Sequence, residues 1–259
     1  MIRVMVAGAG GRMGSEVVHA VAAAEGMQLV AAVDPTVTGC LLEGGVKCIP
    51  DLASAIAEFS PDVMVDFTHP SSVEANLRIA LTHGVHCVVG TTGLTNETLD
   101  DIASAAVDGA CLFYAPNFAI GAVLMMSFAQ RAAKYLPHAE IVELHHDQKA
   151  DAPSGTAVRT AALIASARSE RPETPGAETE LPGMQGARGA TVDGVHVHSI
   201  RLSGLVAHQE VIFGGPGQTL TIRHDSLDRT SFMPGVILAI REVGSRSGLV
   251  VGLENLMGE

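Results

Sequence analysis

Two adjacent histidines and a nearby lysine form the densest group of reactive side chains in the sequence. His145 and His146 stand side by side, and Lys149 follows three residues after the second of them. Histidine is the side chain best suited to donate a proton near neutral pH, and lysine adds a compact positive charge. The pattern predicts a site that binds an anion and protonates a substrate.

A predicted helix begins directly after this cluster. Pro153 precedes Ser154, Gly155 and Thr156, and Ser154 or Gly155 can cap the helix. The unpaired N–H groups of a helix N-terminus attract anions, so these residues favour binding of a carboxylate. The spacing of the histidines and cysteines supports no zinc site, and no metal is expected.

A second reactive segment is rich in glycine and lies near the N-terminus. It follows an apolar run and precedes a helical pattern, the context of a dinucleotide fingerprint. Glycines allow a tight turn and a close approach to a pyrophosphate. Asp34 ends the next apolar run, where an acid can bond a ribose 2′-hydroxyl. The predicted cofactor residues are Gly8, Ala9, Gly10, Gly11, Arg12, Met13 and Asp34.

The glycine spacing departs from the strict G-x-G-x-x-G pattern, because the last glycine of the segment is Gly14. Two further loops also follow predicted strands, and ligands of open α/β sheets bind beyond the carboxyl ends of strands. We expect both loops to line the cofactor cleft, with His69 making a minor contact. These loops contain Gly90, Thr91 and Thr92, and Ala115, Pro116, Asn117 and Phe118.

The elements that must position these residues alternate between strand and helix in the first half of the chain. This alternation predicts an α/β fold with an N-terminal Rossmann-like, doubly wound parallel sheet. The predicted strands at 62–67 and 85–89 contain the continuous apolar runs VMV and CVV, which are typical of strands buried on both faces. Cys87, in one of them, is predicted to be a small core residue.

After Pro116 the pattern changes to a C-terminal α+β domain with an open mixed sheet. We expect a dinucleotide-binding domain at 1–117 and 227–259, and a domain for substrate binding and oligomerisation at 118–226. Residues 169–193 are predicted to be a long loop. The expected elements of this half are helices at 118–136, 156–167 and 229–243, strands at 140–144 and 249–253, and antiparallel strands at 195–202, 209–213 and 219–224.

The composition limits the partners and the cellular compartment that we expect for the protein. The 259 residues are 47% hydrophobic, and 28 acidic against 16 basic residues give a formal charge of −12. An acidic chain with few aromatic residues argues against partners such as nucleic acid or an anionic membrane, although a local basic pocket can still bind a small anion. The four cysteines show no Cys-x-x-Cys spacing, which favours a reduced, cytoplasmic protein without a membrane-spanning segment.

The run from Glu143 to Ala157 resembles the signature of the 4-hydroxy-tetrahydrodipicolinate reductase family, also called dihydrodipicolinate reductases. The family pattern reads Glu, an apolar residue, His-His, two variable residues, Lys, one variable residue and Asp-x-Pro-Ser-Gly-Thr-Ala, and every fixed position is present. The segments GAGGRMG, DFTHP, GTTG, APNF and RHDSLDRTSF extend the resemblance, of the actinobacterial type, over essentially the whole chain.

The resemblance implies reduction of a cyclic imine dicarboxylate of diaminopimelate and lysine biosynthesis, with NADH or NADPH, by a cytoplasmic enzyme. It implies a homotetramer built through the C-terminal sheet. His145 would be the general acid, assisted by Lys149, while His146, Gly155 and Thr156 would bind the substrate together with Ser154 at the helix cap.

Two positions depart from the family. Gln148 makes the site less cationic than in relatives that carry a third histidine there. Pro35 follows Asp34 where some relatives carry an arginine that contacts the 2′-phosphate of NADPH. Since Asp34 should repel that phosphate and Arg12 can compensate only in part, we expect use of both cofactors, with NADH at least as good.

Two other functions fit parts of the sequence. One is a different Rossmann-type dehydrogenase of amino-acid metabolism, such as a relative of aspartate or homoserine dehydrogenase, which would need no His-His-x-x-Lys run. The other is a non-catalytic NAD-binding sensor, in which His145→Gln would change nothing measurable. A panel of substrates assayed by loss of NADH separates these functions.

Overall fold

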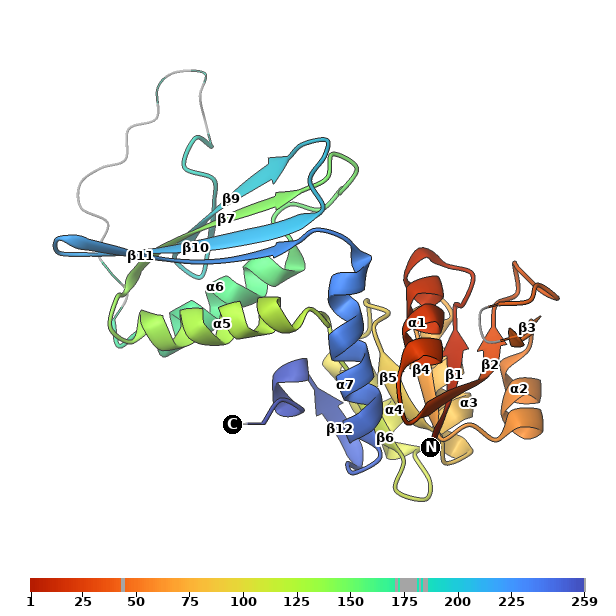
Figure 1. Ribbon diagram of the computed structural model, residues 1–259. Helices are drawn as coiled ribbons and strands as arrows, with labels where there is room; N and C mark the ends of the chain where they lie inside the picture. The colour runs from red at the N-terminus through yellow and green to blue at the C-terminus, as the bar shows by residue number, and fades with distance from the viewer. Residues whose placement is uncertain (43–44, 171, 173–180, 182, 184–185, 259) are drawn as a thin grey trace. The chain divides into compact units, whose positions relative to one another are not determined.

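The computed structural model describes residues 1–42, 45–170, 172, 181, 183 and 186–258. Contacts divide the chain into two compact units (Figure 1). The first unit comprises Met1–Ile120 and Arg229–Glu259, and the second comprises Gly121–Asp228.

The first unit contains a seven-stranded sheet in the order β12-β6-β5-β4-β1-β2-β3, and all neighbouring pairs are parallel. The predicted doubly wound parallel sheet is therefore confirmed, and β3 is a short strand that the sequence did not predict. The strands are β1 (Ile2–Ala7), β2 (Met27–Val33), β3 (Cys48–Ile49), β4 (Val63–Asp66), β5 (His86–Val89), β6 (Cys111–Tyr114) and β12 (Gly248–Val251).

Helices bury both faces of this sheet, which explains its continuously apolar strands. One core joins alternate strand residues, including Met64 and Cys87, to α2, α3 and α4, while α1 and α7 lie on the opposite face (Figure 1). Cys87 is fully buried, as predicted. The helices are α1 (Arg12–Ala23), α2 (Leu52–Phe59), α3 (Val73–Thr82), α4 (Asn96–Ser104) and α7 (Met233–Val243).

The observed start of helix α3 differs from the predicted start. The sequence places its start at Pro70, but the helix begins at Val73. The amides of Ser72 and Val73 both donate to the carbonyl of His69, so the residues between form a turn before the helix. That turn carries His69 beyond the end of β4.

The second unit contains a five-stranded mixed sheet in the order β11-β10-β7-β9-β8. Helices α5 (Ile120–Ala133) and α6 (Gly155–Ala167) lie on one face of this sheet (Figure 1). The side chains of Ile141, Val197 and Val211 are buried on that face. The strands are β7 (His138–His145), β8 (Ala190–Val192), β9 (Val195–Arg201), β10 (Ala207–Gly215) and β11 (Gln218–Ser226).

The predicted antiparallel arrangement of the last three strands is wrong for β9. Strands β10 and β11 are antiparallel neighbours, but β9 pairs with β7 in parallel register, and β7 separates it from β10. Between β7 and β9 the chain passes through α6 and then through β8, which pairs antiparallel with β9. Since β9 occupies one edge of β7, β10 pairs with the other edge.

About half of the loop predicted at 169–193 lies outside the described part of the chain, namely residues 171, 173–180, 182 and 184–185. The prediction of a loop is wrong for the described end of this segment. Residues Ala190–Val192 form β8, which pairs antiparallel with β9.

Candidate active site

The glycine segment of the first unit forms the turn between β1 and α1. Gly8 has a φ of +79°, and a Cβ there would lie 2.4 Å from the carbonyl oxygen of Phe67. A Cβ on Gly14 would lie 1.9 Å from the carbonyl oxygen of Gly8. Gly14, the glycine that departs from the strict spacing, therefore lies where α1 touches the turn. Gly11 precedes α1 without a side-chain cap, so the turn presents backbone N–H groups. This cradle fits a pyrophosphate.

Asp34 lies at the end of β2 and is bonded into the same turn. Its carboxylate accepts from the amide of Gly10 at 3.0 Å, and from the amide and hydroxyl of Thr36 at 2.8 and 2.6 Å. Burial alone would raise the pKa of Asp34, but these hydrogen bonds outweigh it and the pKa is lowered. The carboxylate is therefore ionised and fixed beside the glycine turn.

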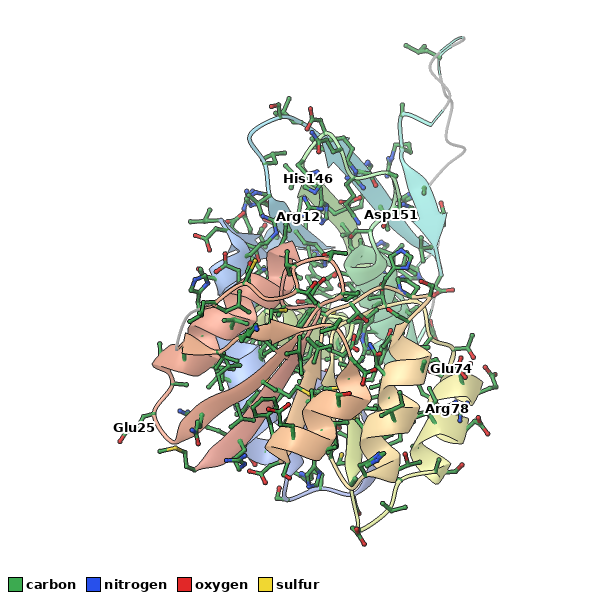
Figure 2. All side chains as sticks on the ribbon, turned by 90° about the vertical axis from the view of Figure 1, so that its right-hand side faces the viewer. Arg12, Glu25, Glu74, Arg78, His146 and Asp151 are labelled. Carbon is green, nitrogen blue, oxygen red and sulfur yellow. The ribbon has the colours of Figure 1, made fainter. Side chains whose placement is uncertain are left out.

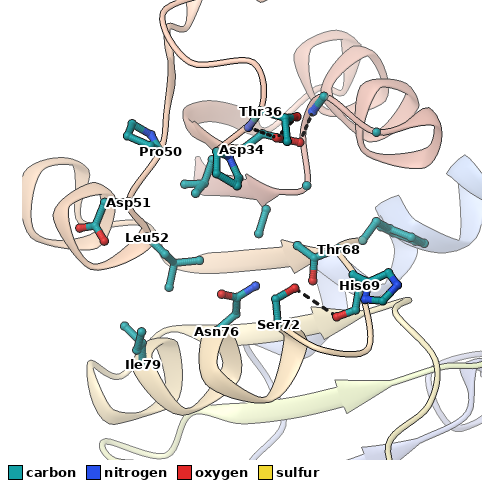
Figure 3. A pocket seen from close by; sticks show the side chains of 17 residues that line it. Asp34, Thr36, Pro50, Asp51, Leu52, Thr68, His69, Ser72, Asn76 and Ile79 are labelled. Carbon is teal, nitrogen blue, oxygen red and sulfur yellow. Dashed lines mark hydrogen bonds between the residues drawn. The ribbon is translucent and has the colours of Figure 1, made fainter.

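A cavity of about 480 Å³ opens beside Asp34 (Figure 3). Of the predicted cofactor residues, it is lined by Gly8, Gly10, Gly11 and Asp34, while the predicted loops after β5 and β6 do not line it. His69, expected to be a minor contact, is among the lining residues. The cavity is also lined by residues that were not predicted to bind the cofactor: Thr36, Pro50, Asp51, Leu52, Ser72, Asn76 and Ile79.

A buried carboxylate joins two of the loops at this edge of the sheet. Asp66, the last residue of β4, is 0% exposed. Its Oδ1 accepts from the Thr68 hydroxyl and the Thr91 hydroxyl, both at 2.7 Å, and its Oδ2 accepts from the Asn76 amide at 2.9 Å. Asp66 therefore ties the loops after β4 and β5 to α3. A Cβ on Gly90 would meet the Phe67 ring at 2.1 Å, which explains the glycine at that position.

The loop after β6 is anchored by an aromatic cluster. The Phe118 ring is 2% exposed, and its centroid lies 5.7 Å from that of Phe67 and 6.0 Å from that of Phe113. The Phe118 side chain thus serves packing. Asn117 accepts from the Ala119 amide at 2.9 Å, which shapes the turn that leads into α5.

In the second unit, the end of β7 carries a buried glutamate beside the predicted catalytic histidine. Glu143 is 0% exposed, and its Oε2 accepts from His145 Nδ1 at 2.5 Å. Arg201, at the end of β9, donates to both carboxylate oxygens at 2.8 and 2.9 Å. Glu143 and His145 are two positions apart on a strand, so they project from the same face.

Lys149 lies in the loop after β7 and is paired with an acidic side chain. Its Nζ contacts both carboxylate oxygens of Asp151, at 2.7 and 2.8 Å. Arg201 Nη2 donates to the main-chain carbonyl of Asp151 at 2.7 Å, which attaches this loop to the Glu143 pair. His146 is exposed just beyond the strand (Figure 2).

Helix α6 begins at this loop, as predicted. The Ser154 hydroxyl accepts from the Ala157 amide at 3.2 Å and caps the helix, while the Ser154 amide donates to Glu143 Oε1 at 3.3 Å. Gly155 is exposed, and nothing lies within 4 Å of the position that a Cβ would take there. An anion can therefore approach the first turn, which contains Gly155 and Thr156.

The charges around His145 act in opposite directions. Burial is the main effect and lowers its pKa, and the charges of Lys149 and Arg201 lower it further, although Glu143 partly compensates. Burial would raise the pKa of Glu143, yet hydrogen bonds from Arg201, Ser199 and His145 lower it overall. In the ligand-free protein, Glu143 is thus ionised and the neutral form of His145 is favoured.

Arg201, Glu143 and Asp66 were missed as functional residues. A glutamate two positions before a candidate histidine on a strand is a usable signal, because both side chains share a face. Arg201 follows Glu143 by 58 positions and gives no local signal. Within the described ranges, no group of three or more histidine, cysteine, aspartate or glutamate residues could hold a metal ion. No helix of the described chain is long and apolar enough to cross a membrane.

The fold and the glycine turn define a Rossmann-class dinucleotide-binding protein. Solved structures of low identity show the same fold: an amine dehydrogenase from Mycobacterium smegmatis is 15% identical with a TM-score of 0.67, over 96% of this chain and 94% of that one.

The family is defined by closer matches. Models of the dihydrodipicolinate reductase N-terminus and C-terminus match residues 2–118 and 121–257. The 4-hydroxy-tetrahydrodipicolinate reductase of Mycolicibacterium vanbaalenii is 53% identical over 258 residues, and that of Desulfitobacterium hafniense is 51% identical over 267 residues, covering 98–99% of each chain. A dipicolinate-bound dihydrodipicolinate reductase from Paenisporosarcina sp. TG-14 is 46% identical, with a TM-score of 0.86 over 99% of this chain and 100% of that one. The chain belongs to the dihydrodipicolinate reductase family.

Proposed function

We propose that the protein reduces 4-hydroxy-tetrahydrodipicolinate to tetrahydrodipicolinate with NADH or NADPH, in the biosynthesis of diaminopimelate and lysine. The observation that carries the proposal is the cluster in the second unit, where His145, Lys149 and the N-terminus of α6 are bonded into one network. The printed names of the full-length relatives support the same activity.

The second unit offers the groups that a dicarboxylate needs. Lys149 would release Asp151 and bind one carboxylate, which the N–H groups of Gly155 and Thr156 would also contact. His146 would contact the rim of the ring. Holding the ring in one orientation can contribute about 7–11 kcal/mol to lowering the barrier in favourable cases.

Loss of the 4-hydroxyl group of the substrate as water gives a conjugated imine ring, and the reduced cofactor, when bound, supplies the hydride that adds to this ring. The residues of the glycine turn, Asp34 and the loops after β5 and β6 would hold it. The reduced ring, an enamine-like carbanion, then needs a proton, which His145 would donate with assistance from Lys149. Because the pKa of His145 is lowered in the ligand-free protein, we expect the two substrate carboxylates to raise this pKa as they bind.

The preferred cofactor follows from the charge beside the ribose. Asp34 would accept from the ribose hydroxyls of NADH and repel the additional phosphate of NADPH, while Pro35 offers no positive charge. Arg12, at the start of α1, would compensate in part. We therefore expect activity with both cofactors and a kcat/KM for NADH at least equal to that for NADPH. A strong preference for NADPH would contradict this expectation.

We also propose that the first unit binds the dinucleotide and the second unit binds the substrate. The second unit would assemble a homotetramer through its sheet, in the cytoplasm. Light scattering in solution measures the assembly directly.

The experiment that tests the function is turnover of freshly generated substrate by the wild type, His145→Gln and Lys149→Ala. The wild type should consume NADH only with this substrate among a panel of amino-acid-pathway substrates. Loss of the general acid should lower kcat by about 10²-fold or more. Turnover of another substrate with none of this one would reject the proposal, as would unchanged kinetics of His145→Gln.

A further inference from the structure

Glu143 is the point at which all parts of the candidate substrate site are connected. Its side chain is fully buried, although a glutamate is rarely fully buried unless it is paired. The carboxylate accepts from four groups on three segments: His145 of β7, Arg201 and Ser199 of β9, and the Ser154 amide before α6. These partners join the end of β7, β9 and the start of α6 through one carboxylate.

We propose that Glu143, held by Arg201, is a positioning residue that sets the tautomer of His145 and the placement of Lys149 for the protonation step. This inference rests on the proposed function and identifies residues for that reaction beyond His145 and Lys149. Glu143 would act through the histidine and the loop, without contacting the substrate.

The tautomer follows from the chemistry of the pair. An ionised carboxylate can only accept, so His145 must carry a hydrogen on Nδ1 to bond with Glu143 Oε2. The transferable proton must then be on Nε2, on the side of the ring away from Glu143. A carboxylate that bonds one ring nitrogen orients the imidazole and fixes which nitrogen carries the hydrogen.

The placement of Lys149 depends on the same carboxylate. Arg201 uses its Nη2 atom both for Glu143 Oε1 and for the main-chain carbonyl of Asp151, whose side chain binds Lys149. The loop that carries the lysine is therefore attached through Arg201 to the residue that orients the histidine.

A glutamine at position 143 cannot replace the glutamate. Arg201 donates to both oxygens, and an arginine has no acceptor, so the NH₂ group of an amide must oppose a donor in either orientation. If the NH₂ group turned toward His145, the imidazole would have to shift its hydrogen to Nε2 in order to accept. The charged groups facing His145 are Glu143, Lys149 and Arg201, so the variant also removes the one negative charge among these three groups.

The test compares Glu143→Gln with the wild type and with Glu74→Gln as control. Glu74 also bonds an arginine, Arg78, but on the exposed surface of α3 (Figure 2). We expect Glu143→Gln to lower kcat by about 100-fold, as small misplacements of catalytic groups do. The KM for NADH should change by less than about twofold, because Glu143 has no role in holding the dinucleotide.

A second readout needs no turnover. Nitrogen NMR of histidine-labelled protein, with His145 assigned through His145→Gln, should give the Nδ1–H tautomer in the wild type and loss of that signature in Glu143→Gln. Glu74→Gln should match the wild type in both measurements. Retention of kcat within threefold together with the Nδ1–H tautomer in Glu143→Gln would overturn the proposal.

Arg201→Lys keeps the proposal testable if circular dichroism shows that Glu143→Gln does not fold. Lysine retains the charge but lacks the two-pronged donor, so we expect a higher KM for the dicarboxylate and a lower kcat. Wild-type kinetics in Arg201→Lys would count against the proposal. If the wild type itself does not turn over the substrate, the proposed function fails, while the tautomer measurement still judges the role of Glu143.

Discussion

Among the described residues, each of the two units buries one carboxylate completely, and the two units satisfy it in opposite ways. Asp66 in the first unit accepts from the hydroxyls of Thr68 and Thr91 and from the amide of Asn76, all neutral donors. Glu143 in the second unit accepts from Arg201 and His145, which carry or can carry positive charge. Equal burial therefore conceals two different electrostatic environments.

The difference fits the roles that we propose for the two sites. A dinucleotide site of this class binds mainly through backbone N–H groups, so the first unit needs its loops held in place, and neutral bonds to Asp66 are sufficient. A site that protonates a dianion needs cations of fixed orientation, and a buried cation needs a counter-charge. Glu143 provides that counter-charge.

The largest expected effect is on stability. Glu143→Ala leaves Arg201 without its counter-charge, since the Arg201 side chain is only 19% exposed. Removing one partner of a buried ion pair costs about 3–5 kcal/mol, and we expect a loss of this size in the free energy of unfolding by urea. A loss below about 1 kcal/mol would mean that water already solvates Arg201.

Amide substitutions at the two carboxylates test the difference between their partners. In Asp66→Asn the new NH₂ group can face the side chain of Asn76, which can turn its own oxygen toward it, while the other contacts persist. Glu143→Gln has no such alternative, because the Arg201 guanidinium cannot accept a hydrogen bond. We expect Asp66→Asn to change the unfolding free energy by less than about 1 kcal/mol and Glu143→Gln to cost about 1–3 kcal/mol. Equal losses of unfolding free energy in the two variants, measured by chemical denaturation, would show that the two carboxylates do not differ in this way.

The pH dependence of stability gives a third contrast. The pKa of Glu143 is lowered below its ordinary value of 4.5 in the folded protein, so the unfolded chain binds more protons in this range. The contribution of Glu143 is therefore complete above about pH 4.5 and is lost as the pH falls through the folded pKa. The difference in unfolding free energy between the wild type and Glu143→Gln should stay unchanged above about pH 4.5 and should shrink as the pH falls below that value. A constant difference would contradict this assignment.

A further contrast concerns Thr91. Its hydroxyl donates to Asp66 and accepts from the Thr68 amide, each at 2.7 Å. Thr91→Val removes both bonds and should cost about 1–2 kcal/mol, with a severalfold increase in the KM for NADH. Thr91→Ser retains the hydroxyl and serves as the control. If the two variants behave alike, the bond between the loops does not matter for the cofactor site.

Much of the first unit could be predicted from local patterns. Strand–helix alternation and the glycine segment predicted the parallel sheet and the turn at Gly8, because both signals lie within short stretches of chain. The run from His145 to Thr156 was equally accessible, since a strand end, a loop and a helix start follow one another there.

The remainder depends on pairings between distant segments. The parallel pairing of β7 and β9 places Arg201 opposite His145, and no local pattern predicts that register. Asp66 was overlooked because its importance comes from Thr91, 25 positions away on the next strand's loop. The position of β7 between β9 and β10 was missed for the same reason, since short connections suggested a simple antiparallel order.

The most direct test of the account is proton uptake when a dianion binds. Calorimetric titration of dipicolinate near pH 7.5, in the presence of NADH and in buffers of different ionisation enthalpy, measures the protons taken up. Because His145 is held neutral in the free protein and the dianion should charge it, we predict net uptake in the wild type and its loss in His145→Gln. Binding without uptake, or uptake that persists in His145→Gln, would contradict the claim that this histidine becomes the acid.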